Sequence, residues 1–192
     1  MECAPGQAAV CQGDPANLQH AFIALFCSVR APGDVVLQLL DVARALREAG
    51  VPVIGGFHSP MERECLIILL RGTQQVVVCP ARSVKGMRVP AAWRGAMREG
   101  RLSLMSPFAA SQRRATNALA EERNRYVVQQ AAVVLIAHAA PGGRMEALAL
   151  EVTAVGKPLL TLKSPANAHL VDMGARPISE EDVRRGALSD FL

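Results

Sequence analysis

Two glycine pairs each stand between an apolar segment and an expected helix. They are Gly55 with Gly56 and Gly142 with Gly143. Glycine lets the backbone approach a phosphate closely, and the free N–H groups and dipole of a following helix favour an anion. Neither pair completes G-x-G-x-x-G or G-x-x-x-x-G-K-[ST], so a standard dinucleotide fingerprint or P-loop is not expected. One Gly-Gly pair suits an ordinary tight turn, but two pairs at one edge of a sheet indicate an anion-binding site.

Polar and basic side chains at similar junctions could complete such a site. A guanidinium presents a planar set of donors that matches a phosphate, and serine, histidine or asparagine can add hydrogen bonds. Arg125 can equally pair with Glu121 or Glu122 on a helix surface, and Ser59 before Pro60 suits a helix N-cap. The phosphate- or nucleic-acid-binding candidates are Ser28, Arg30, His58, Ser59, Arg82, Arg123, Asn124 and Arg125.

Catalytic and metal-binding patterns find little support. The four histidines are widely separated, and His58 and His138, at strand ends, are the two that could face a ligand. The five cysteines form no C-x-x-C pair, which argues against a zinc site or a disulfide framework. Glu146 and Glu151 are candidate acids for a hydrolase, but no acid–base pair is fixed by spacing. We therefore expect binding without turnover and assign no catalytic residue, metal or cofactor.

Positive charge is concentrated in one part of the chain. Residues 82–125 hold ten of the 21 basic residues but only three of the 17 acidic ones, so the remainder is net negative. Clustered arginine and lysine release counterions from a nucleic-acid backbone, which favours a phosphate-binding face. A solvated arginine-rich surface is the alternative that charge alone leaves open.

Six apolar segments alternate with amphipathic or capped segments. Continuous apolar runs are typical of strands buried on both faces, and their alternation with helices predicts a parallel sheet with right-handed crossovers. Ser59, Pro60 and Glu62 form a capping-box start for one helix. The expected strands are 21–29, 51–57, 74–80, 102–106, 132–139 and 157–163, and the expected helices are 34–49, 60–71, 91–99, 115–131 and 144–155.

The composition fits one domain, with 192 residues of which 51% are hydrophobic. We predict an α/β, Rossmann-like three-layer fold with a mainly parallel sheet of about six strands and helices on both faces. Residues 1–19 are expected to be a flexible tail, and residues 20–192 one domain with a short C-terminal extension from about 165. No apolar run reaches the roughly 18 residues of a membrane helix and the start lacks a signal-peptide pattern, so we expect a cytoplasmic protein without membrane contact.

The order of these junctions resembles the DNA-processing protein A family (DprA, also called Smf), a Rossmann-like member of the SLOG group, over residues 21–190. Residues 123–127, Arg-Asn-Arg-Tyr-Val, resemble the family's Arg-Asn-Arg-Ile-Ile, and residues 133–136 resemble the Val-Leu-Val-Val strand that follows at the same distance. Residues 55–62 are similar to its Ser-Gly-x-Ala-x-Gly-Ile-Asp loop, and residues 167–175 to its closing Asn-x-Leu-Ile-x-x-Gly-Ala.

This resemblance implies binding of single-stranded DNA and loading of a RecA-type recombinase during natural transformation. It also implies a homodimer formed through the core domain. DNA phosphates would lie along the basic cleft, next to Arg30, Arg82, Arg123 and Arg125. His138 stands where the family has a glutamate, so the ligand of the pocket is a separate question.

Two other functions belong to the same fold group. Residues 141–146 superficially resemble the Pro-Gly-Gly-x-Gly-Thr-x-x-Glu turn of lonely-guy-type nucleotide phosphoribohydrolases, but Ala149 stands where that turn has its catalytic glutamate. A nucleotide sensor that binds without turnover is the second alternative. A sensor needs one anion site whereas a DNA binder needs a string of them, and the ten basic residues of 82–125 favour the string.

Overall fold

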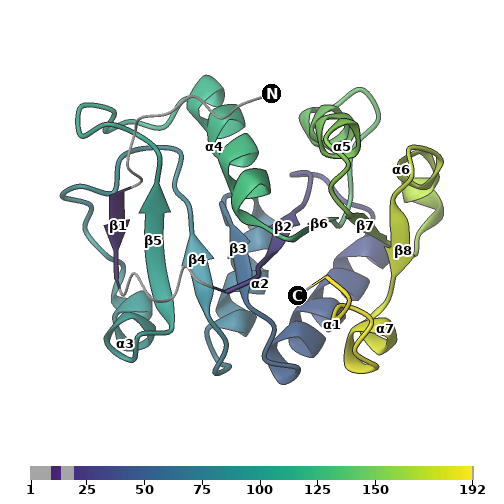
Figure 1. Cartoon of the computed structure of the whole chain (residues 1–192), viewed down its shortest axis with the longest axis horizontal. Coiled ribbons are helices and arrows are strands. Elements are labelled where there is room, and N and C mark those ends of the chain that lie inside the picture. Colours follow the sequence, from purple (N-terminus) through teal and green to yellow (C-terminus); the bar gives the residue numbers. More distant parts are fainter. Residues whose placement is uncertain (1–9, 14–19, 192) are drawn as a thin grey trace.

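The computed structural model describes residues 10–13 and 20–191, and within them the chain forms one eight-stranded sheet (Figure 1). The strand order is β1-β5-β4-β3-β2-β6-β7-β8; β2 to β8 run parallel, and β1 pairs antiparallel with β5. The strands are β1 (Val10–Gln12), β2 (Ile23–Phe26), β3 (Val53–Gly55), β4 (Val76–Val78), β5 (Leu102–Ser106), β6 (Val133–Ile136), β7 (Leu159–Leu162) and β8 (Arg176–Ile178).

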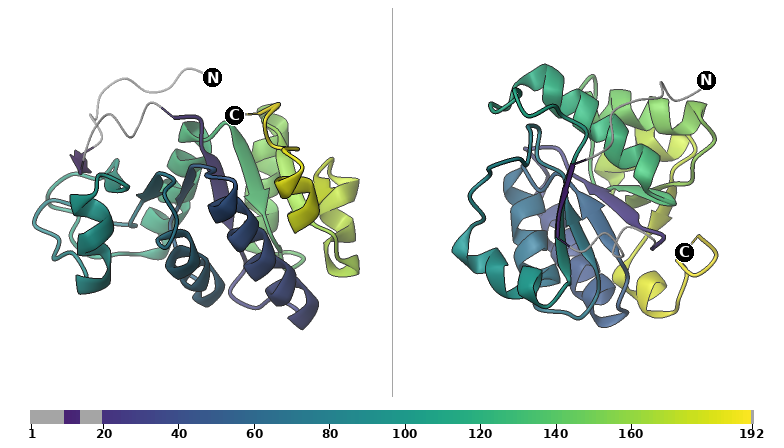
Figure 2. Two further views of the ribbon diagram at one scale, coloured as in Figure 1. Left: turned by 90° about the horizontal axis from the view of Figure 1, so that it is seen from below. Right: turned by 60° about the vertical axis from the view of Figure 1, so that its left-hand side comes forward.

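Helices cover both faces of this sheet, so the predicted α/β three-layer fold is confirmed (Figures 1 and 2). One face packs against α1 (Gly33–Glu48), α2 (Pro60–Leu69), α3 (Arg94–Arg98) and α7 (Glu180–Arg184). The other face packs against α4 (Asn117–Gln130), α5 (Arg144–Ala154) and α6 (Ala168–Asp172). Two 3-10 turns, η2 (Ala91–Trp93) and η3 (Pro165–Asn167), precede α3 and α6.

Strand β2 shows why continuous apolar runs produce this arrangement. Ile23 and Leu25 belong to the core cluster under α1, whereas Ala24 and Phe26 belong to the cluster under α4 and α5. Successive side chains of a strand point to opposite faces, so a strand covered on both sides must be apolar at every position. All four residues of β2 are buried, as this geometry requires.

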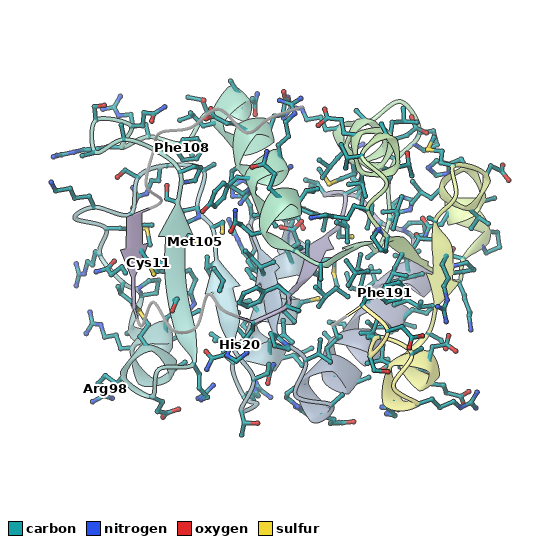
Figure 3. All side chains as sticks on the ribbon, in the orientation of Figure 1. Cys11, His20, Arg98, Met105, Phe108 and Phe191 are labelled. Atoms are coloured by element: carbon teal, nitrogen blue, oxygen red, sulfur yellow. The ribbon has the colours of Figure 1, made fainter. Side chains whose placement is uncertain are left out.

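Two edge strands raise the number of strands above the expected six. β1 lies within the segment 1–19 that we expected to be a flexible tail, so residues 10–12 correct that expectation, while residues 1–9 and 14–19 lie outside the described residues. Cys11 is paired with Met105 of β5, and Figure 3 shows their side chains next to each other. β8, in the expected C-terminal extension, pairs with β7 and continues the same sheet. Neither edge strand has a continuous apolar run, which is why sequence patterning did not indicate them.

The crossovers bring the residues that follow β2, β3, β4 and β6 to one edge of the sheet. Leu25 is paired with Gly55 and with Leu135, and Gly55 is paired with Val78, so these strands end at nearly the same level. This carboxyl edge is the upper edge in Figure 1. Ligands of open parallel sheets bind beyond that edge.

Helix α2 begins at a capping box, as its sequence predicts. The Ser59 hydroxyl accepts a hydrogen bond from the Glu62 main-chain N–H at 3.2 Å, Pro60 occupies the first turn, and the Glu62 carboxylate accepts from the Ser59 N–H. In the part of the chain that the structure describes, none of the helices is long and apolar enough to cross a membrane.

Replacing Ser59 by alanine removes one of these hydrogen bonds. We expect the free energy of unfolding to fall by about 1 kcal/mol, because an orphan N–H at the start of a helix loses its side-chain acceptor. Urea denaturation monitored by circular dichroism measures this. Ser111→Ala, at an exposed loop position, is the control and should change stability by less than about 0.5 kcal/mol. Equal effects of the two substitutions would contradict the capping role.

Candidate nucleic-acid interface

Three adjoining hollows lie along the carboxyl edge of the sheet, and we call them together the carboxyl-edge groove. The first is a cavity of about 400 Å³ between the ends of β2 and β3 and the helices α4 and α5. The second, of about 730 Å³, shares Val29, His58, Ala120, Arg123 and Arg144 with the first. The third, of about 520 Å³, lies over the loop after β4 and shares Arg82 and Met87 with the second.

Most of the residues predicted from sequence line this groove. Ser28, Arg30, His58, Ser59, Arg123 and Asn124 line the first cavity, and Gly56 and Arg82 line the second hollow. The structure therefore brings together residues that lie up to 96 positions apart in the chain. Gly55 is buried within β3, and Gly142 and Gly143 form the turn before α5 but are not among the residues that line these three hollows.

Glu62, which we predicted only as part of the capping box of α2, also belongs to the candidate site. Its Oε1 accepts the Cys27 N–H at 3.0 Å, and its Oε2 accepts the N–H groups of His58 at 2.8 Å and Ser59 at 3.3 Å. The side chain is 5% exposed and lines the first cavity. One buried carboxylate thus ties the end of β2 to the loop after β3 and places a negative charge at the base of the cavity.

Arg123 reaches across from α4 to the end of β4. Its Nη1 donates to the Cys79 carbonyl at 2.7 Å, its Nε donates to Asn124 Oδ1 at 2.8 Å, and the side chain is 5% exposed. Burial lowers the pKa of this guanidinium, and the nearby Glu62 carboxylate opposes that shift. The Gly56 backbone packs against the same guanidinium, because a Cβ built on Gly56 would lie 1.6 Å from Nη1.

Arg125 does not line the first cavity, which Arg123 lines. Arg125 forms a two-point ion pair with Glu151 of α5, with Nε to Oε2 and Nη2 to Oε1 both at 2.8 Å. Residues two positions apart on a helix point in different directions, and here one faces the sheet and the other the neighbouring helix. Arg125 lines a smaller hollow of about 140 Å³, which adjoins the first cavity through Glu121, Asn124 and Arg144.

Removing the Arg125 side chain tests how much this ion pair stabilises the fold. The pair lowers the pKa of Glu151 through the hydrogen bond and charge of Arg125. A carboxyl whose pKa is lower in the folded state stabilises above its unfolded pKa, and that contribution disappears as the pH falls through the folded pKa. Both side chains are about half exposed, so we expect Arg125→Ala to cost less than about 1 kcal/mol at pH 7.

Urea unfolding of wild type, Arg125→Ala, Glu151→Gln and the double variant at pH 7 and at pH 3 measures this effect. The two single variants should lose similar small amounts at pH 7, the double variant should lose less than their sum, and the coupling should shrink at pH 3. A coupling that is as large at pH 3 as at pH 7 would contradict the ion-pair interpretation.

The ends of β2 and β6 are held together by main-chain and hydroxyl contacts. The Ser28 N–H donates to the His138 carbonyl at 3.0 Å, and the Ser28 hydroxyl accepts the Ala140 N–H at 3.1 Å. The His138 side chain is buried, with Nδ1 2.8 Å from Asn167 Oδ1. Contrary to the expectation that it could face a ligand, His138 lines none of the three hollows.

The turn before α5 is built from its two glycines. Gly142 has φ +70°, and a Cβ on Gly143 would lie 2.7 Å from the Ala140 carbonyl oxygen. Glu146 then accepts the Gly142 N–H at 2.6 Å. The turn places the N-terminus of α5, with Arg144 and Met145, against the first cavity, which adds a helix dipole of favourable sign for an anion.

Several residues of the groove were not among the sequence candidates. Arg144 lines the first two hollows and crosses to α4, where it pairs with Glu121 at 3.3 Å. Lys85 and Arg113 line the third hollow. Trp93 lines the second hollow together with Arg82 and His58. The excess of basic residues in 82–125 was the sequence signal for the two loop cations, whereas nothing in the sequence distinguished Trp93 from a core residue.

Solved structures share this architecture at low sequence identity. DprA from Helicobacter pylori, which has a single-stranded DNA binding mode, superposes with a TM-score of 0.79 at 18% identity, covering 98% of this chain and 90% of its own. DprA from Streptococcus pneumoniae gives a TM-score of 0.77 at 13% identity, covering 96% of this chain and 66% of its own. The chain has the fold of DNA-processing protein A.

Proteins that bind another ligand share this fold with lower structural similarity. The molybdenum cofactor binding protein from Rippkaea orientalis gives a TM-score of 0.61 at 13% identity, covering 91% of this chain and 99% of its own. The molybdenum cofactor carrier protein from Chlamydomonas reinhardtii gives 0.56 at 12% identity, covering 90% and 98%. No family model and no curated protein matches the sequence. The DprA fold is established by structure, and the ligand must be argued from the groove.

Proposed function

We propose that the protein binds single-stranded DNA along the carboxyl-edge groove and acts in DNA processing like DprA. The observation that carries this proposal is the distribution of cations. Arg30 and Arg144 stand at the first cavity, Arg82 at the boundary of the second and third hollows, and Lys85 and Arg113 in the third. A run of cations along a groove matches successive phosphates of one strand, whereas a mononucleotide would use only one end of it.

The groove also offers surfaces for bases. Trp93 and His58 line the second hollow between the cations, and base stacking on aromatic side chains contributes to sequence-tolerant binding of single strands. The main-chain N–H of exposed His58 donates to Glu62 Oε2, so the capping box of α2 holds the backbone from which this ring projects. Support from the fold comes from H. pylori DprA, which binds single-stranded DNA.

A nucleotide-sized ligand in the first cavity is the second candidate. The volume of the first cavity, about 400 Å³, favours it, as does the likeness to molybdenum cofactor carriers. A phosphoribohydrolase has less support, because Ala149 is fully buried and the acids of α5 are engaged, Glu146 with the Gly142 N–H and Glu151 with Arg125. In the described part of the chain, the carboxylates that line the first cavity are Glu62 and Glu121.

Binding of a fluorescent single-stranded oligonucleotide over a series of salt concentrations tests the proposal, with a panel of mononucleotides as competitors. We expect a steep fall of log Ka with log salt and little competition, because several phosphates must be neutralised together. A flat salt dependence with strong competition by one nucleotide would overturn the DNA-binding function in favour of the small-ligand candidate. Release of free base from that nucleotide would then be assayed.

The resemblance to DprA further supports a homodimer and a RecA-type recombinase as partner, and both are part of this proposal. Analytical ultracentrifugation measures the first, and pull-down of purified recombinase with and without oligonucleotide measures the second. A cytoplasmic location stays a prediction from the sequence.

A further inference from the structure

The Arg144 side chain bridges two helices at the carboxyl-edge groove. Arg144 is the first residue of α5, and it lines the first cavity, the second hollow and the smaller hollow that Arg125 also lines. Its Nε lies 3.3 Å from Glu121 Oε1, and its Nη1 donates to Asn117 Oδ1 at 3.2 Å. Both partners belong to the first two turns of α4, and Figure 1 shows α4 and α5 at the upper edge of the sheet. A strand that follows the groove must therefore pass this bridge.

This bridge is weaker than the other ion pair between α4 and α5. The pair of Arg125 with Glu151 has two hydrogen bonds, both at 2.8 Å. Arg144 instead approaches Glu121 through one nitrogen at 3.3 Å, and the two side chains are 59% and 44% exposed. An exposed ion pair of this kind typically stabilises by a factor of about five or less. Another anion can therefore take the place of the Glu121 carboxylate at little cost.

The surroundings of Arg144 favour a phosphate as that anion. A guanidinium carries five N–H donors in a planar fork, and the contact with Asn117 uses only one of them. Arg30 lines the same cavity, and the N-terminus of α5 adds a dipole that attracts negative charge. Carboxylate and phosphate both present pairs of oxygens to such a fork, so Glu121 and a phosphate compete for the same guanidinium.

We propose that Glu121 is an internal competitor of DNA, whose carboxylate holds Arg144 until a phosphate of the strand takes its place. The charge of Arg144 is neutralised by Glu121 before binding and by the phosphate afterwards. The exchange therefore releases no counterion at this residue, and it keeps the affinity of the groove below the value that its cations allow. This inference rests on the proposed binding of single-stranded DNA.

The first test replaces the competing carboxylate. Glu121→Gln should bind a fluorescent thymine oligonucleotide of about 12 nucleotides about threefold more tightly at low salt in anisotropy titrations. The slope of log Ka against log salt should steepen by about 0.7, because Arg144 then contributes one more released counterion. The control is Glu122→Gln, the same change of charge at an exposed neighbouring residue that lines none of these hollows. Equal effects of the two substitutions would mean that net charge is the cause, and would overturn the proposal.

A double-variant cycle shows whether Glu121 acts through Arg144. Arg144→Ala alone should weaken binding, and adding Glu121→Gln to Arg144→Ala should change affinity by less than about 1.5-fold, because the guanidinium for which the carboxylate competes is absent. If Glu121→Gln strengthens binding as much without Arg144 as with it, the carboxylate repels the strand directly and no exchange takes place.

The affinity of the wild type separates this inference from the proposed function. If the wild type binds the oligonucleotide and Glu121→Gln binds it no more tightly, the internal competitor is overturned while the DNA-binding function stands. Weaker binding by Glu121→Gln, with the fold intact by circular dichroism, would show that the bridge shapes the groove for the strand, which is the opposite of competition. If neither the wild type nor any variant binds, both proposals fail.

Discussion

Replacing Gly56 by alanine is expected to lower the free energy of unfolding by about 3 kcal/mol. The added Cβ would lie 1.6 Å from Arg123 Nη1 and 2.0 Å from Cζ, distances at which atoms cannot coexist. Arg123 must then leave its place, which breaks its 2.7 Å bond to the Cys79 carbonyl and leaves a buried acceptor and a displaced charge. Removing one partner of such buried polar contacts typically costs several kcal/mol.

A double-variant cycle shows whether Arg123 is the cause. Arg123→Met alone should also destabilise, because it removes the same hydrogen bonds, but Gly56→Ala combined with Arg123→Met should cost little more than the larger single change. The matched control is Gly95→Ala in α3, where an added Cβ meets no atom within 4 Å, so stability should stay the same or rise. Urea unfolding measures all four variants. Additive effects of the two substitutions would rule out the clash as the source.

The structure gives a different reason for glycine at position 56 from the one that the sequence suggested. A Gly-Gly pair at a strand end indicated close approach of a ligand phosphate, and Gly56 does line the groove. In the structure, however, a guanidinium from the same chain occupies the space that a side chain would fill. A glycine pair in the sequence indicates that some group packs closely against the backbone, but it does not identify that group. Here the group is the guanidinium of Arg123, which lies 67 positions later in the chain.

The fold was predictable because its signals are local and repeated. Continuous apolar runs separated by capped helices determine a parallel sheet covered on both faces, and handedness rules then place the carboxyl ends of the strands together. β1 and β8 escaped detection for the opposite reason. An edge strand is only partly covered, so fewer of its side chains must be apolar. In β8, Arg176 and Pro177 are exposed and only Ile178 is buried. What such strands pair with depends on the rest of the sheet rather than on their own residues.

The candidate site was predictable in its location and less so in its members. Ser28, His58, Ser59 and Asn124 follow directly from junctions between strands and helices or from the motif on α4. The helical periodicity of α4 already implies that Arg123 and Arg125 diverge, a consequence that the motif match alone obscured. Trp93 reaches the groove through the packing of η2, which no local pattern encodes.

The salt dependence of DNA binding should depend on the loop cations rather than on the Arg123 and Arg125 pair. Arg123 is held by the Cys79 carbonyl and Arg125 by Glu151, so neither guanidinium is fully available to a phosphate. Lys85 and Arg113 are exposed in the third hollow, and Arg82 lies at its boundary. Each phosphate contact with a single strand contributes about 0.7 to the slope of log Ka against log salt.

Replacing Arg82, Lys85 and Arg113 together by alanine should therefore reduce that slope by about 2 and weaken binding at low salt by at least about tenfold. The control variant removes three equally charged side chains, Arg71, Arg98 and Arg176, which are exposed away from the groove; Figure 3 shows Arg98 at the opposite edge of the molecule. Anisotropy titrations from low to moderate salt measure both. If net charge alone attracted DNA, the two variants would lose equal slope. A loss confined to the loop variant would mean that the strand leaves the first cavity over the loop after β4, since only phosphates bound next to these side chains release counterions there.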